Sequence, residues 1–202
     1  GKFGIRQADE EWDCEARRYY FNIVGKYGVQ VQNVLKAASA LDIEVIAPLH
    51  GPILTENLEH YINLYDTWSS YKPEDQGVYI ACASIHGHTY EAAKRLREIL
   101  LEKGEKIVEL ADLGREDIAE AVEDGFRYDR IVFATCTYDG GIFLPMADYI
   151  THLKAKGYQN RKAAIIENGS WAPAAGKQIK EQLEKKRIIK IFMRSEERRV
   201  GK

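Results

Sequence analysis

The chain has 202 residues, enough for one or two domains with a buried core. Its 29 basic and 31 acidic side chains give a formal net charge of -2, so neither nucleic acid nor a membrane surface is the expected partner. No apolar run is long enough to span a bilayer, and we recognise no signal peptide. The three cysteines form no C-x-x-C pair, so we expect a reducing, cytoplasmic location.

The first part of the chain is predicted to be mainly helical. Apolar stripes predict helices over Glu11–Val24 and Gln30–Leu41, with faces that lack an evident partner surface. A short strand is predicted over Ile43–Ala47 and a third helix over Asn57–Ser70. The turn between these last two elements contains His50, and its simplest interpretation from the residues alone is a hydrogen-bonded structural histidine.

A polar stretch containing Pro73 and Gly77 separates this part from a second part with a different pattern. We therefore place one domain at residues 1–72 and another at residues 77–192. Residues 193–202 show no helical apolar stripe, and we expect them to be a disordered tail or an artefactual extension of the gene.

Strands and helices alternate in the second domain. The predicted strands are Val78–Ala83, Lys106–Leu110, Arg130–Thr135, Lys162–Glu167 and Ile188–Phe192. The predicted helices are Thr89–Lys103, Glu116–Glu123, Pro145–Ala155 and Ala174–Lys185. Continuous apolar strands joined by amphipathic helices indicate a doubly wound α/β fold with a five-stranded parallel sheet. Cys82 and Cys136 fall in strand-like runs and are predicted to be buried, small apolar residues.

Three loops follow the carboxyl ends of these strands, where doubly wound sheets bind their ligands. The first loop consists of Ser84, Ile85, His86, Gly87, His88 and Thr89. It leads directly into a helix, so its backbone N–H groups and the helix dipole favour a phosphate group. The hydroxyls of Ser84 and Thr89 could donate to phosphate oxygens, and Gly87 would permit a tight turn.

The other two loops each place an aromatic ring beyond a strand end. The second loop consists of Thr137, Tyr138, Asp139, Gly140 and Gly141, and the third of Asn168, Gly169, Ser170 and Trp171. Two aromatic side chains above a phosphate loop suit a flat heteroaromatic ring with a phosphorylated tail. We therefore predict that the three loops bind flavin mononucleotide (FMN).

Each feature also has a simpler structural interpretation. A single Ser-x-x-Gly-x-Thr pattern often marks only a helix N-cap, and His86 and His88 could be solvated loop residues. Tyr138 and Trp171 could pack on protein neighbours rather than on a ligand. The carboxylate of Asp139 would disfavour an anionic reduced flavin. We assign no side chain a catalytic role.

Together the motifs resemble those of the flavodiiron proteins (A-type flavoproteins), which join a metallo-β-lactamase-like domain to a flavodoxin-like domain. The family's S-x-x-G-x-T loop is matched by Ser84, Gly87 and Thr89, and its P-T-Y-N-N-G-type loop by Thr137, Tyr138 and Gly141. In the latter loop Cys136 replaces the proline, and Asp139 and Gly140 replace the asparagines. Its G-S-x-x-W-type loop is matched loosely by Gly169, Ser170 and Trp171. The resemblance runs from Gly1 to about Phe192, which implies the end of a metallo-β-lactamase-like αββα domain before a flavodoxin-like domain.

The resemblance also implies a metal ligand. Ala47–Pro52 is similar to the family's P-x-H-G-P loop, so His50 would be a ligand of a non-haem di-iron centre, for which imidazole and carboxylate are suitable. The family's H-x-E-x-D-H cluster would lie upstream of this sequence. The acidic residues that match no ligand position are Asp9, Glu10, Asp13 and Glu15. We therefore predict that this chain alone forms no di-iron centre.

In the intact family, the resemblance implies an oxidoreductase. Electrons from a rubredoxin or a flavin/NADH reductase would enter the FMN and pass to the di-iron centre, which reduces dioxygen to water or nitric oxide to nitrous oxide. The resemblance further implies a head-to-tail homodimer. Two alternatives stay open at this point: an FMN-binding electron carrier without its own metal, and an inert truncation whose first domain cannot fold properly.

Overall fold

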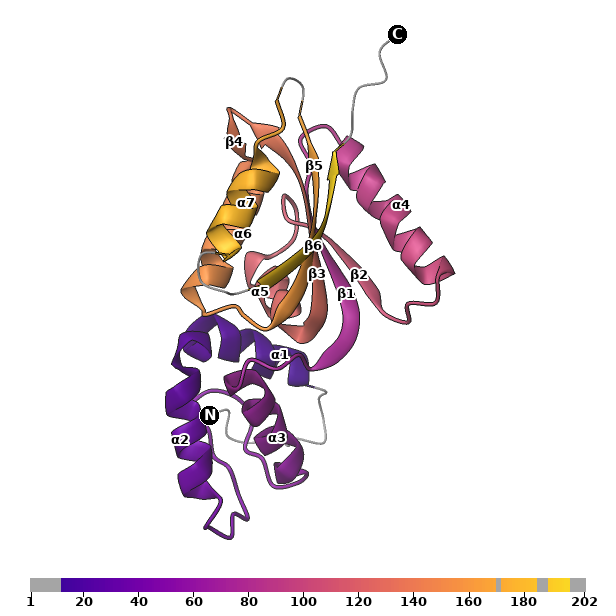
Figure 1. The fold of residues 1–202 in the computed structure, drawn as a ribbon. Coiled ribbons are helices and arrows are strands. Elements are labelled where there is room, and N and C mark those ends of the chain that lie inside the picture. The colour runs from indigo at the N-terminus through magenta and orange to yellow at the C-terminus, as the bar shows by residue number, and fades with distance from the viewer. Residues whose placement is uncertain (1–11, 170–171, 185–188, 197–202) are drawn as a thin grey trace. The chain divides into compact units, whose positions relative to one another are not determined.

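The computed structural model describes residues 12–169, 172–184 and 189–196. The chain forms two compact units, which we call the N-terminal unit (residues 1–72) and the C-terminal unit (residues 73–202) and describe separately (Figure 1). Within the described ranges, no helix is long and apolar enough to cross a membrane.

The described part of the N-terminal unit is largely helical. Its elements are α1 (Asp13–Tyr19), the π-helical turn η2 (Tyr20–Val24), the 3-10 turn η3 (Gly25–Tyr27), α2 (Gly28–Ala38) and α3 (Leu58–Ser69). Tyr20 and Phe21 are fully buried, and their ring centroids lie 5.5 and 6.3 Å from that of Trp68. An aromatic cluster therefore joins η2 to α3.

The strand predicted over Ile43–Ala47 does not form. The backbone there makes a single antiparallel bridge, in which Ile46 and Leu54 exchange two hydrogen bonds of 2.9 Å. A strand needs a neighbouring strand along its length, and the described part of this unit provides none beyond the bridge. An apolar pattern alone was therefore not sufficient evidence for a strand in this segment.

The C-terminal unit contains the predicted parallel sheet. Its parallel strands are β1 (Asp75–Ala83), β2 (Val108–Asp112), β3 (Tyr128–Tyr138), β5 (Arg161–Asn168) and β6 (Ile189–Glu196). They lie in the order β2-β1-β3-β5-β6, and the short strand β4 (Gly141–Ile142) pairs antiparallel with the end of β3. Counting only the parallel strands in chain order gives 2-1-3-4-5, which is the flavodoxin-like order and confirms the predicted fold class.

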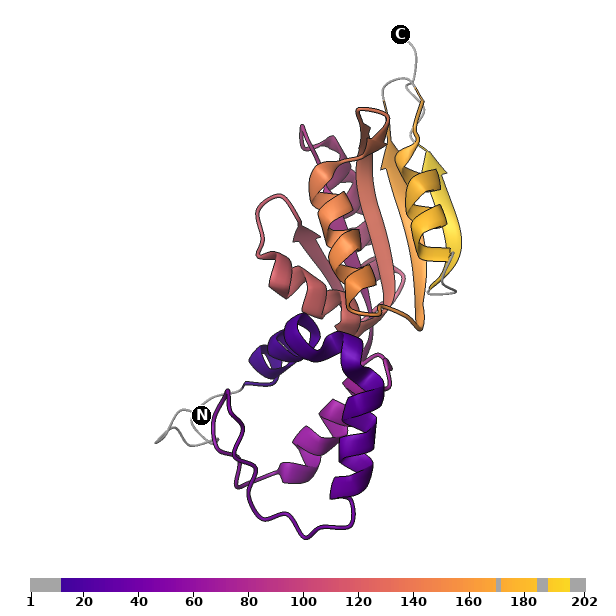
Figure 2. The same cartoon turned by 90° about the vertical axis from the view of Figure 1, so that its left-hand side faces the viewer.

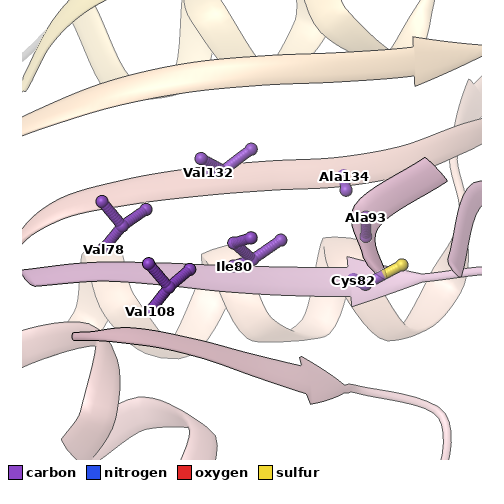
Figure 3. Close-up of a cluster of buried hydrophobic side chains, with 7 residues drawn as sticks. All are labelled: Val78, Ile80, Cys82, Ala93, Val108, Val132 and Ala134. Carbon is purple, nitrogen blue, oxygen red and sulfur yellow. The ribbon is translucent and has the colours of Figure 1, made fainter. Parts of the chain in front are cut away.

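Helices lie on both faces of this sheet (Figures 1 and 2). The helix on one face is α4 (His88–Glu102), and those on the other are α5 (Ile118–Arg127), α6 (Leu144–Ala155) and α7 (Ala175–Glu184). The central strand β1 is buried from Gly77 to Ala83, as expected for a strand covered on both sides. Figure 3 shows part of the core next to α4, which consists of Val78, Ile80, Cys82, Ala93, Val108, Val132 and Ala134.

Two elements, β6 and α5, extend furthest beyond their predicted ends. β6 pairs with β5 as far as Glu196, so residues 193–196 belong to a strand and not to a disordered tail. Ladder hydrogen bonds come from the backbone, and for this reason a polar sequence can continue an edge strand. Residues 197–202 lie outside the described residues. The other extended element is α5, which continues to Arg127 and not only to Glu123.

Candidate cofactor site

The three predicted loops meet at one edge of the sheet. β1 and β3 pair with Ala83 beside Thr135, and β3 and β5 pair with Cys136 beside Asn168. The first loop therefore starts next to the second, and the second starts next to the third. The strand order reverses at β1 and β3, which is the position where doubly wound sheets bind ligands.

The first loop leaves the N-terminus of α4 without a side-chain cap. Gly87 is the N-cap residue and has a left-handed backbone with φ of 87°. A Cβ atom at Gly87 would meet no described atom within 4 Å, so the space beside this turn is open. Ile85, His86 and His88 are exposed, whereas Thr89 is buried in the first turn. The first N–H groups of α4 are therefore accessible to an anion, which the helix dipole also favours.

The second loop is a two-residue β-hairpin between β3 and β4. Its turn residues, Asp139 and Gly140, have φ angles of 48° and 68°. A type I′ turn requires positive φ at both positions, and Asp-Gly is a sequence signal for it. Asp139 thus has a structural role that the sequence analysis did not identify. Tyr138 is 48% exposed and its ring lies edge-on to Phe143 at 5.8 Å, so much of the tyrosine ring is open to a ligand.

Thr137 holds the N-terminus of α7. Its hydroxyl oxygen accepts hydrogen bonds from the N–H groups of Ala174 and Ala175, at 2.9 and 3.2 Å. Because both acceptor positions of the hydroxyl are used, the capacity that remains is one donated hydrogen bond. Such a hydroxyl suits a ligand group that only accepts, such as a phosphate oxygen or a ring carbonyl. Gln178 of α7 donates to the carbonyl oxygen of Gly140 at 2.8 Å.

A buried carboxylate precedes the third loop. Glu167 is fully buried near the end of β5 and accepts a hydrogen bond of 2.7 Å from the N–H of Gly176. None of Glu167, Gly176 and Gln178 is predicted from the sequence to take part in the site. Their partners are distant in the chain and no local motif marks them, so only their hydrogen bonds identify them.

The third loop is described in part. Asn168 ends β5 and is half-buried. A Cβ atom at Gly169 would lie 3.0 Å from the Cα of Pro173, which leaves little room for a side chain. Ser170 and Trp171 lie outside the described residues, so their role in binding a cofactor stays a prediction.

Cys82 and Cys136 are buried, as the sequence predicts. Burial raises the pKa of the Cys82 thiol to about 12. Burial also raises the pKa of the Cys136 thiol, although a hydrogen bond from the backbone of Ile85 opposes this shift. That hydrogen bond links the first loop to the second. With raised pKa values, neither thiol has the character of an activated nucleophile.

His50 lies in an exposed bend of the N-terminal unit, beside a cavity of about 620 Å³. Tyr19 lines the same cavity, and the two ring centroids are 5.4 Å apart. Glu15 also lines it, but its carboxylate pairs with Arg18 at 2.5 Å. The described residues contain no group of three or more His, Cys, Asp or Glu side chains that could hold a metal ion. They do not provide a donor set for iron by themselves, and His50 as a ligand stays a prediction.

A parallel sheet of this order, with ligand loops at its switch point, defines a flavodoxin-like domain. No protein-family model matches the chain. The chain is 20% identical to the anaerobic nitric oxide reductase flavorubredoxin of Escherichia coli over 173 residues, or 84% of this chain and 36% of that protein. It resembles the solved structure of the rubredoxin oxygen:oxidoreductase of Desulfovibrio gigas, with a TM-score of 0.83 and 20% identity over 94% of this chain and 48% of that one.

A variant of the flavo di-iron protein of Thermotoga maritima is similar to the same degree, with a TM-score of 0.83 and 20% identity over 98% of this chain and 51% of that one. The resemblance seen in the sequence is therefore confirmed, because nearly the whole chain has a fold found in flavodiiron proteins. The chain spans less than half the length of the curated relatives it matches and about half that of the two solved chains.

Proposed function

We propose that this chain binds FMN at the three loops and takes part in flavin-mediated electron transfer. The observation that carries the proposal is the open, uncapped N-terminus of α4 at the switch point, together with the exposed ring of Tyr138 in the second loop. The first feature suits a phosphate and the second a flat ring system. Similar folds in flavodiiron proteins support the same choice of cofactor.

In this proposal the phosphate group lies at the start of α4. The backbone N–H groups around Gly87 would hold it, together with the hydroxyls of Ser84 and Thr89. Tyr138 and Trp171 would flank the ring, and the Thr137 hydroxyl would donate to an acceptor of the ligand. Bound FMN would supply one- and two-electron chemistry that side chains lack.

We further infer that the chain is part of a longer oxidoreductase. Relatives named as a rubredoxin oxygen:oxidoreductase and a nitric oxide reductase flavorubredoxin support dioxygen or nitric oxide as the substrate and a rubredoxin as the donor. We keep a flavin/NADH reductase as the alternative donor. In that protein the N-terminal unit would complete a metallo-β-lactamase-like domain, with His50 as one iron ligand. We also propose that the longer protein forms a head-to-tail homodimer and is located in the cytoplasm. An electron carrier without its own metal would require the same flavin site.

Gly87→Ala tests the site, and Gly104→Ala is a matched control. Both glycines have positive φ (87° and 94°), and a Cβ atom at either would meet no described atom within 4 Å. They lie at opposite ends of α4, and each substitution should destabilise the fold by about 1–2 kcal/mol. At Gly87, however, the added methyl group would occupy the space where the phosphate approaches. We expect FMN to bind Gly87→Ala roughly ten-fold more weakly, and Gly104→Ala about as tightly as the wild type.

The measurement is a titration of FMN followed by quenching of its fluorescence, with riboflavin as a second ligand. Riboflavin lacks the phosphate and should bind the wild type much more weakly than FMN. Equal loss of FMN affinity in both alanine variants, or equal affinity of the wild type for FMN and riboflavin, would refute a phosphate site at α4. A folded wild type that binds no FMN would refute the proposed function.

A further inference from the structure

We propose that Glu167 is a positioning residue for the flavin site, which it supports by anchoring α7 beneath two of the three loops. This inference rests on the proposed FMN site. The carboxylate lies at the carboxyl end of β5, directly before the third loop, and is fully buried. Glu167 is not among the residues that the sequence predicts to bind FMN.

The N-terminus of α7 is capped by other elements and not by its own residues. Pro173, Ala174, Ala175 and Gly176 have no side-chain acceptor. Instead, Thr137 of β3 accepts from two of the first N–H groups, at 2.9 and 3.2 Å, and Glu167 of β5 accepts from the next one at 2.7 Å. The start of α7 is therefore held by one residue from each of two strands.

The hydrogen bonds of α7 reach the second loop and the strand that leads into the third. Thr137 belongs to the hairpin that carries Tyr138, and Gln178 on the next turn of α7 donates to the Gly140 carbonyl at 2.8 Å. Glu167 lies two residues before Gly169 of the third loop. A displacement of α7 would therefore disturb the hairpin of the second loop and the end of β5, from which the third loop starts.

The Glu167 carboxylate fits against the first turn of α7 because residue 176 is a glycine. A Cβ atom at Gly176 would lie 2.8 Å from the Cδ and Oε1 atoms of Glu167, which is too close for a real contact. Glycine in the first turn of a helix is otherwise less favourable than alanine by about 1 kcal/mol. Here the missing methyl group makes room for the carboxylate. A negative charge at a helix N-terminus also interacts favourably with the helix dipole.

Thr135 is a second buried polar side chain in the part of the core that contains Glu167. Its hydroxyl is fully buried and has no hydrogen-bond partner among the described residues. Thr135 pairs with Glu167 in the β3–β5 register, although its hydroxyl makes no hydrogen bond to the carboxylate in this structure. Two buried polar side chains, those of Thr135 and Glu167, therefore neighbour each other where β3 and β5 approach the loops.

The test uses four variants of the full chain: Glu167→Ala, Glu167→Gln, Gly176→Ala and the double variant Glu167→Ala/Gly176→Ala. FMN affinity is measured by fluorescence quenching, ring environment by visible circular dichroism of the bound flavin, and folding by far-ultraviolet circular dichroism. Lys180→Ala is the control, because Lys180 is an exposed residue of the same helix.

We expect Glu167→Ala to weaken FMN binding about ten-fold or more and to change the visible dichroism of the flavin. Glu167→Gln keeps an oxygen acceptor for the Gly176 N–H and should restore most of the affinity. Gly176→Ala should weaken binding although alanine is the better helix former. The double variant should bind no more weakly than Glu167→Ala, because the methyl group then occupies vacated space.

A folded Glu167→Ala variant with wild-type FMN affinity and dichroism would overturn the inference while leaving the proposed function intact. If Glu167→Ala does not fold, wild-type affinity and dichroism in Gly176→Ala would overturn it. Additive losses in the double variant would also count against it, because they would show that the two positions act independently. A wild type that fails to bind FMN identifies instead a failure of the proposed function.

Discussion

Asp139 and Gly140 combine turn chemistry with proximity to the proposed ligand. Both residues adopt positive φ, which Asp, Asn and Gly tolerate best, so the residue types follow from the hairpin turn. The negative charge of Asp139 is a separate matter. A carboxylate near the flavin destabilises an anionic reduced form, and would therefore lower the reduction potential.

Asp139→Asn separates these two roles. Asparagine preserves the turn but removes the charge, so we expect unchanged stability and a higher flavin reduction potential. A repulsion of about 1.4 kcal/mol would correspond to a rise of about 30 mV for the two-electron couple. Glu102→Gln is the control. Glu102 is the last residue of α4, at the end of the helix away from the first loop, so this substitution should leave the potential unchanged. A potential that stays the same in Asp139→Asn would show that this carboxylate does not act on the flavin.

At the level of elements, the close packing of α5 on α6 explains a glycine inside a helix. Gly125 is buried in α5, and a Cβ atom there would overlap the hydroxyl group of Tyr149 in α6. Helix propensity alone favours alanine over glycine by about 1 kcal/mol at such a position. The packing between the helices requires glycine nevertheless.

We expect Gly125→Ala to lower the free energy of unfolding by about 1–3 kcal/mol, in spite of the better helix propensity of alanine. Tyr149→Phe removes the overlapping hydroxyl and should recover much of that loss in the double variant. Denaturant unfolding of the wild type, the two single variants and the double variant would measure this coupling. Stabilisation by Gly125→Ala alone would contradict the packing argument.

At the level of the whole molecule, the loops and the predicted iron ligand lie in different units. Ser84–Trp171 contains all three loops and belongs to the C-terminal unit, whereas His50 belongs to the N-terminal unit. One imidazole cannot hold two iron ions against water, and the described residues offer no group of three suitable ligands. FMN binding and iron binding should therefore separate in this chain.

We expect the purified chain to bind FMN but to retain no stoichiometric iron after reconstitution and removal of free metal. His50→Ala should leave FMN affinity unchanged. Iron content can be measured by elemental analysis alongside the flavin absorbance of the same sample. Two tightly bound iron ions per chain would contradict the prediction, and loss of those ions in His50→Ala would identify the ligand.

The elements of the C-terminal unit could be predicted because their signals are local. Continuous apolar runs such as Val78–Ala83 mark buried strands, and an amphipathic stripe marks α4. The positions of the loops at strand ends followed from the same pattern. In contrast, Ile43–Ala47 looked like a strand but has no strand to pair with along its length in the described part of its unit.

The sequence by itself thus determined the parallel α/β class, the position of the three loops and the burial of Cys82 and Cys136, since these depend on residues near one another in the chain. Only the tertiary structure decided that Thr137 and Glu167 cap α7, that Asp139 forms a hairpin turn with a paired β4, and that Gly176 makes room for a carboxylate. Most of these features join residues that are distant in sequence, and no local pattern specifies which distant groups a fold brings within hydrogen-bonding distance.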